Sequence, residues 1–129
     1  MTLYELKDVR RTVLLSKAAE CIKKLSAARE GISVEIAPEA MEHSLRAAER
    51  EMAVEEMEST YCVLRQVESA LSRLERGRYA VCLKCGERIS DKRLDALPWA
   101  AYCVGCQEGV DALHRGVKEL LRNEYRRAA

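Results

Sequence analysis

The sequence predicts a mainly α-helical protein, built as an antiparallel helical hairpin of the coiled-coil type, a small four-cysteine zinc-finger module and a C-terminal helix. Three observations support this fold class. Ala, Leu, Val, Glu, Arg and Lys dominate a chain of 129 residues with one Trp and no Phe, which is typical of long helices. Apolar residues recur at steps of three and four along the first 77 residues. Two Cys-x2-Cys pairs follow, separated by seventeen residues.

A first helix is predicted over roughly residues 3–29. Thr2 and Glu5 have the spacing of a capping box, in which a hydroxyl residue and an acid three residues later satisfy each other's backbone N–H groups. Gly31 is a plausible C-terminal stop. One apolar face is expected to hold Leu6, Val9, Val13, Leu14, Ala18, Cys21 and Leu25.

A second, longer helix is predicted to follow a short connection. Pro38 suits its first turn, where the missing N–H costs nothing, and Gly77 ends it, giving about 39 residues and roughly 58 Å. Two successive helices with so short a connection are expected to be antiparallel neighbours, with the tip of the hairpin near residues 30–42 and the whole hairpin over 1–77. The expected apolar positions are Met41, Leu45, Ala48, Met52, Met57, Leu64, Val67, Leu71 and Leu74.

The two cysteine pairs have the spacing of a four-thiolate zinc site. Each pair forms a tight turn with both sulfurs inward, and the intervening segment is long enough to close a tetrahedron. The alternatives are four unrelated buried thiols or two disulfides. We therefore predict one structural Zn2+ in a module over residues 78–108, bound by Cys82, Cys85, Cys103 and Cys106.

The neighbours of these cysteines and the ligand count refine the prediction. Gly86 and Gly105 are expected where backbone approaches the sulfurs closely, and Lys84 and Arg88 are expected to offset negative charge at the metal. Four thiolates leave no open position for water or substrate, so catalysis by the metal is not expected. No nucleophile–base arrangement or phosphate loop is evident either, and we expect a protein that is not an enzyme.

Two further helices complete the chain. Ser90 is expected to cap a short helix between the cysteine pairs, which Pro98 stops. A last helix is expected after Cys106, over 109–129. Gly105, Gly109 and Gly116 weaken it where they fall in its interior, so it is expected to depend on docking against the rest of the protein. Its apolar side would carry Val110, Leu113, Val117, Leu120, Leu121 and Tyr125.

Charge is unevenly distributed although the net charge is only +1. Residues 31–77 contain ten Asp/Glu against five Lys/Arg, and the flanking segments are mildly basic. A general nucleic-acid binder would cluster positive charge on one face, so direct sequence-specific DNA binding is not expected. An acidic helical element suits a basic or metal-containing partner instead.

The sequence also bears on location. It has no apolar run of about eighteen residues, so no membrane span is expected, and its N-terminus lacks the apolar region of a signal peptide. Free thiols and a zinc–thiolate site both fit a reducing compartment. We expect a cytoplasmic monomer.

The chain resembles the DksA/TraR family of bacterial transcription regulators over roughly residues 30–110. The zinc spacing alone is generic, but the arginine-leucine-x-alanine-x-proline stretch between the cysteine pairs is specific. The residues that carry the resemblance are 74–82 (Leu-Glu-Arg-Gly-Arg-Tyr-Ala-Val-Cys), 85–90 (Cys-Gly-Glu-Arg-Ile-Ser), 92–98 (Lys-Arg-Leu-Asp-Ala-Leu-Pro) and 102–107 (Tyr-Cys-Val-Gly-Cys-Gln).

The resemblance implies a function. Members of this family bind RNA polymerase and insert the hairpin through its secondary channel, so that acidic residues at the tip lie near the catalytic Mg2+; many act with the alarmone ppGpp in the stringent response. The family's two tip aspartates correspond to Glu39 and Glu42, and the alanine that follows them corresponds to Ser44. Gln107 stands where the resemblance would lead us to expect a basic side chain that assists ppGpp, so dependence on ppGpp is left open.

Two other functions are open from the residues alone. The first is a thiol sensor in which oxidation of the cysteines releases zinc. The second is a nucleic-acid-binding zinc module, which would use Lys92, Arg93, Arg122, Arg126 and Arg127.

Overall fold

The described part of the chain, residues 2–32 and 40–128 of a computed structural model, is mainly helical. Side chains are described outside positions 31–45. The four helices are α1 (Leu3–Ile32), α2 (Ala40–Glu75), α3 (Asp91–Ala96) and α4 (Val104–Ala128). The chain divides into two units, Met1–Tyr79 and Ala80–Ala129. Among the described residues, none of the helices combines the length and the apolar character needed to cross a bilayer.

The first helix begins at the predicted capping box. The Thr2 N–H donates to Glu5 Oε2 at 2.7 Å, and the Glu5 N–H donates to Thr2 Oγ1 at 3.3 Å. These two bonds satisfy N–H groups that have no partner inside the helix. The helix continues to Ile32, slightly beyond the predicted end.

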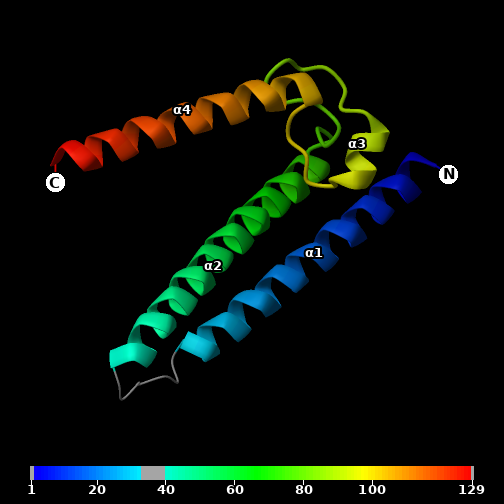
Figure 1. The fold of residues 1–129 in the computed structure, drawn as a ribbon. Coiled ribbons are helices and arrows are strands. Elements are labelled where there is room, and N and C mark those ends of the chain that lie inside the picture. Colours follow the sequence, from blue (N-terminus) through cyan, green and yellow to red (C-terminus); the bar gives the residue numbers. More distant parts are fainter. Residues whose placement is uncertain (1, 33–39, 129) are drawn as a thin grey trace. The chain divides into compact units, whose positions relative to one another are not determined.

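In the first unit α1 and α2 lie side by side and antiparallel, which confirms the predicted hairpin (Figure 1). Their contact follows the alternating steps of three and four that define a coiled coil. The buried or half-buried residues that follow these steps include Leu14, Ala18, Cys21, Leu25 and Ala28 on α1, and Ala53, Met57, Thr60, Leu64, Val67, Leu71 and Leu74 on α2.

The predicted apolar faces need correction at two places. The side chains of Leu6, Val9 and Val13 are 37%, 50% and 42% exposed. The contact with α2 is made instead by the seven-residue repeat that contains Leu14, whose positions lie one residue later in the sequence than Leu6 and Val13. That repeat continues through the half-buried Lys7. The other correction concerns α2: Met52 is 70% exposed and Ala48 is exposed as well, because the contact passes through Ala53. The predicted positions Met41 and Leu45 lie where side chains are not described.

Charged side chains complete the hairpin at the end nearest the finger sequence. Lys7 Nζ lies 3.9 Å and Arg11 Nε 3.5 Å from the carboxylate of Glu75. All three side chains are about half exposed, so these pairs contribute little to stability. They place Lys7 and Arg11 of α1 opposite Glu75 of α2.

The end of α2 is set by Gly77, which has a positive φ of 73°. The Arg78 N–H donates to the Arg73 carbonyl at 2.8 Å and the Gly77 N–H to the Leu74 carbonyl at 3.2 Å. This is the Schellman arrangement, in which a residue in the left-handed conformation lets the chain turn back onto the last carbonyls. Glycine adopts that conformation without the steric cost of a Cβ. The predicted stop at Gly77 is confirmed.

In the second unit α3 is the short helix predicted between the cysteine pairs. Ser90 caps it, since its Oγ accepts from the Arg93 N–H at 3.3 Å. Leu94 anchors it with a side chain that is only 2% exposed.

The last helix, α4, differs from the prediction in where it starts. It begins at Val104 and therefore includes Cys106 in its first turn. No side chain along its described length is buried. The expected docking of its apolar side against the rest of the protein stays a prediction. The exposed apolar residues include Leu113, Val117, Leu120, Leu121 and Tyr125.

Candidate metal centre

The first cysteine pair lies in a tight turn closed by backbone hydrogen bonds. The Cys82 N–H donates to the Glu87 carbonyl at 2.8 Å, and the Gly86 N–H donates to the Cys82 carbonyl at 3.0 Å. Gly86 has a φ of 75° and open space around its missing Cβ. Its role is therefore to supply a positive φ. The prediction that Gly86 and Gly105 permit close backbone approach is wrong, because no atom lies within 4 Å of a Cβ built at either position.

The second pair straddles the start of α4. Cys103 immediately precedes the helix, and the Gln107 N–H donates to its carbonyl at 2.9 Å. Because Cys106 follows three residues later, in the first turn, both side chains lie on the same side of the chain. The Leu83 N–H donates to the Ala101 carbonyl at 2.9 Å, which joins the two turns directly.

These turns bring the four sulfur atoms of Cys82, Cys85, Cys103 and Cys106 within 4.8 Å of one another. The Sγ atoms of Cys85 and Cys103 are 3.9 Å apart. A regular tetrahedron with Zn–S bonds of about 2.3 Å has edges of about 3.8 Å. All six cysteines are free, so the alternative of two disulfides is not supported. The donor set and its spacing fit one Zn2+.

Backbone N–H groups from both turns converge on Cys82. They lower its pKa from 9.0 to about 6, chiefly through the Cys85 N–H and then through those of Cys103 and Lys84, although burial acts in the opposite direction. Such donors stabilise a thiolate, which is the form that binds a metal. Cys82 is thus the sulfur best prepared as a ligand.

Two other thiols favour the protonated form in the absence of metal. A hydrogen bond with the Cys103 side chain, followed by burial, raises the pKa of Cys106 to about 12. The pKa of Cys85 is also raised: the Glu87 N–H lowers it, but the Cys82 side chain and burial together outweigh that effect. A metal would have to displace the protons of both thiols.

The two cations that were expected to offset charge at the cysteines, Lys84 and Arg88, both have other contacts. Arg88 forms an exposed ion pair with Asp91 at 3.2 Å, so the expectation that it offsets charge at the sulfurs is not supported. Lys84 lies over the backbone of α4, because a Cβ added at Gly109 would be 3.2 Å from its Nζ. Gly109 thereby makes room for the lysine, a contact that sequence reasoning did not anticipate.

The predicted tip acids are separate from this centre in sequence. Glu39 lies outside the described residues, and Glu42 lies in the first turn of α2, where its side chain is not described. Their role at the tip therefore stays a prediction.

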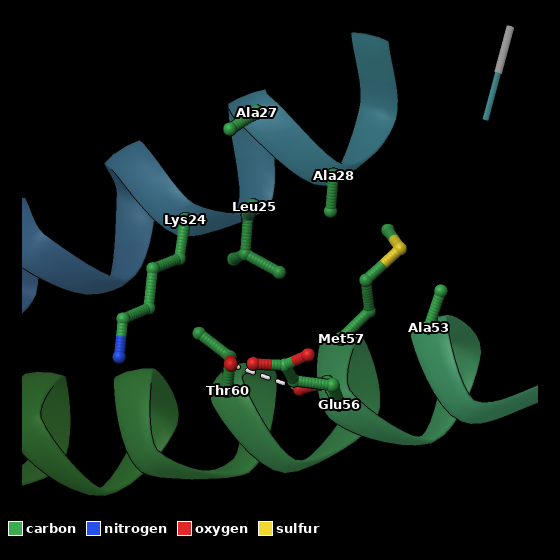
Figure 2. A pocket seen from close by; sticks show the side chains of 8 residues that line it. All are labelled: Lys24, Leu25, Ala27, Ala28, Ala53, Glu56, Met57 and Thr60. Atoms are coloured by element: carbon green, nitrogen blue, oxygen red, sulfur yellow. Dashed lines mark hydrogen bonds between the residues drawn. The ribbon is translucent and has the colours of Figure 1, made fainter. Parts of the chain in front are cut away.

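A small cavity lies between α1 and α2. It has a volume of about 210 Å³, and Figure 2 shows Leu25 and Ala28 pointing from α1 towards α2 and Met57 pointing back. Two of its polar side chains bond within their own helices: Lys24 Nζ lies 3.4 Å from the Glu20 carboxylate, and the Thr60 hydroxyl donates to the Glu56 carbonyl at 2.8 Å. Nothing here converges on a ligand, so the cavity is a packing feature of the hairpin.

Comparison with known proteins agrees with the metal centre. Residues 77–112 match the prokaryotic dksA/traR C4-type zinc finger. An uncharacterised protein of Aquifex aeolicus (strain VF5) is 46% identical over 48 residues. That alignment covers 37% of this chain and 33% of the relative, so the chain matches about a third of that protein's length.

Solved structures extend the similarity beyond the finger. The transcription factor DksA2 from Pseudomonas aeruginosa has a TM-score of 0.72 and 25% identity, covering 84% of this chain and 85% of its own. A second structure is the RNA polymerase binding protein and transcriptional regulator Dks from Chlamydia trachomatis. It has a TM-score of 0.54 and 23% identity, with 87% and 93% covered, and shows a similar fold.

Proposed function

We propose that this protein is a bacterial transcription regulator that binds RNA polymerase. The first support is that residues 77–112 match the prokaryotic dksA/traR C4-type zinc finger. The observation that carries the proposal is the joint occurrence of this finger and a long helical hairpin in the fold of DksA2, over 84% of the chain. The finger alone would be compatible with many functions. The hairpin that precedes it in the chain narrows them to that of a regulator with the fold of DksA2.

The proposed mechanism assigns each unit a task that requires no chemistry from the protein. Zinc held by four thiolates has no open coordination position, so the finger is a structural base and the protein is not an enzyme. The hairpin is the arm, which enters the secondary channel of the polymerase. Glu39 and Glu42 at the tip add negative charge near the catalytic Mg2+ or the mobile loops around it, and thereby modulate initiation in the cytoplasm.

The acidic character of α2 supports an electrostatic role for the arm. Glu49, Glu51, Glu55, Glu56 and Glu58 are all exposed on this helix. An acidic rod approaching a basic or metal-containing channel is steered by the field of its partner.

The test is transcription in vitro from a ribosomal RNA promoter with the cognate RNA polymerase, with and without ppGpp. The intact protein is compared with a double variant, Glu39→Ala with Glu42→Ala. We expect the intact protein to change transcript output and the double variant to bind polymerase but lose most of that effect. A dependence on ppGpp would be measured in the same assay.

A matched control keeps the charge change and moves its position. Glu55→Ala with Glu58→Ala removes two exposed acids, also three residues apart, from the middle of α2. This pair should retain the effect on transcription. If both double variants lose activity equally, overall charge rather than the tip is responsible. If the intact protein does not bind polymerase, the proposed function is wrong.

A further inference from the structure

The path of the chain into the second cysteine pair is held by two consecutive carbonyl groups. The Ala101 carbonyl accepts from the Leu83 N–H of the first turn at 2.9 Å. The next carbonyl, that of Tyr102, accepts from Arg93 Nε at 3.0 Å in a partly buried position. Cys103 therefore follows directly after a peptide group that α3 holds in place.

The Tyr102–Cys103 peptide has a second bonded end. Its carbonyl oxygen accepts from Arg93, and its N–H donates to the sulfur of Cys82. A peptide group is planar, so fixing the direction of the carbonyl also fixes the direction of the N–H. Hydrogen bonds in such a chain also polarise one another.

Arg93 is itself well placed to hold this peptide. Its own backbone N–H is bound by the capping Ser90, and its carbonyl accepts from the Leu97 N–H at 2.7 Å. The adjacent Leu94 is buried and anchors α3 within the finger. The side chain thus extends from a helix that is capped at one end and packed in the middle.

We infer that Arg93 is a positioning residue for the metal centre: through the Tyr102–Cys103 peptide it aims an N–H at the Cys82 sulfur and sets the approach of Cys103. This role differs from the phosphate contact that a nucleic-acid-binding module would require of Arg93. It also concerns the metal site alone and is independent of any partner.

The inference is tested with the zinc-loaded protein and three substitutions that separate hydrogen bonding from charge. Arg93→Met keeps an unbranched apolar chain and removes the donor. Arg93→Gln carries an uncharged nitrogen donor at the same bonded position as Nε. Arg93→Lys keeps the charge but places its donor one atom further out, without the planar geometry of the guanidinium.

The measurements are the rate of zinc transfer to a chelator, the zinc dissociation constant by competition, and the absorption spectrum with Co2+ in place of Zn2+. Loss of outer groups that orient metal ligands typically costs about 10- to 100-fold in affinity. We expect Arg93→Met to lose at least about tenfold with a shifted Co2+ spectrum, and Arg93→Gln to recover most of both.

A nearby arginine provides the matched control. Arg88 lies in the same finger but forms an exposed ion pair with Asp91, so Arg88→Met should leave zinc affinity and the Co2+ spectrum unchanged. Recovery by Arg93→Lys but not by Arg93→Gln would overturn the inference, because charge alone would then explain the effect. Unchanged zinc binding in Arg93→Met would overturn it as well. If Arg93→Met does not fold, the comparison between the Gln and Lys variants still decides.

Discussion

At the scale of single residues, the four cysteines are chemically unequal before any metal binds. Three backbone N–H groups point at Cys82 and hold its pKa near 6, whereas a neighbouring cysteine raises that of Cys106 to about 12. One ligand is therefore already a thiolate at neutral pH, and Cys106 carries a proton that zinc must displace.

This inequality predicts a change in the pH dependence of zinc affinity. Above about pH 6 Cys82 is deprotonated in the metal-free finger and releases no proton on binding; below it Cys82 is protonated and releases one. As the pH falls through 6, the logarithm of the association constant should therefore decline more steeply, by one further proton. Competition titrations between pH 7.5 and pH 5 measure this slope. A constant slope over that range would contradict the assigned pKa.

At the scale of elements, the hairpin is packed unevenly along its length. The fully buried side chains of the described pair lie toward the end that holds Glu75, among them Leu14, Val67 and Ala70. Further along, the contact is made by half-buried residues around the cavity of about 210 Å³. Small alanines, which favour the helical conformation, leave this space between α1 and α2. The part of the hairpin around the cavity should therefore open locally at a lower free energy than the end that holds Glu75.

Filling the cavity should stabilise the hairpin. Ala28→Leu places apolar atoms where Figure 2 shows Ala28 facing α2, and such fillings commonly add about 1 kcal/mol to the free energy of unfolding. Urea unfolding followed by far-UV circular dichroism measures the change.

The control for this substitution is Ala19→Leu, at an exposed position of the same helix, which should have little effect. A lower stability of Ala28→Leu than of the original protein would show that the alanines are needed for close approach of the two helices.

At the scale of the whole molecule, the chain consists of two units with different sources of stability. The unit Met1–Tyr79 has a continuous helix–helix contact. In the unit Ala80–Ala129 the buried side chains are few, among them Ile89, Leu94 and Ala100, and the described part of α4 buries none. Binding of zinc must therefore supply much of the folding free energy of this second unit.

Removal of zinc should consequently unfold one unit before the other. With a chelator present, the backbone amides of residues 80–110 and of α4 should lose their protection from hydrogen exchange. The amides of the hairpin near Glu75 should keep theirs. Hydrogen exchange with mass spectrometry, with and without added Zn2+, measures both regions in one sample. Parallel loss of protection in the hairpin would show that the two units unfold together.

The family resemblance and the metal centre were both predictable from the chain. The Cys-x2-Cys spacing predicted a cluster that the structure brings together within 4.8 Å. The stretch from Lys92 to Pro98, which carried the family resemblance, lies inside residues 77–112, which match the prokaryotic dksA/traR C4-type zinc finger. These signals succeed because a tight turn fixes each pair locally, and only one closure between the pairs is needed to form the site.

By itself the sequence determined the local features: the capping box at Thr2, the stop at Gly77, the capped helix after Ser90 and the paired cysteine turns. Each depends on bonds between residues close in the chain, which neighbouring side chains encode directly.

The tertiary structure alone decided which of two adjacent apolar stripes of α1 faces α2: Leu14 is buried and Val13 is exposed. Both stripes have helical spacing, so the choice between them depends on how α2 packs against α1. It also decided that Arg93 holds the Tyr102 carbonyl. That bond depends on the route of the chain between the cysteine pairs, which no local pattern specifies.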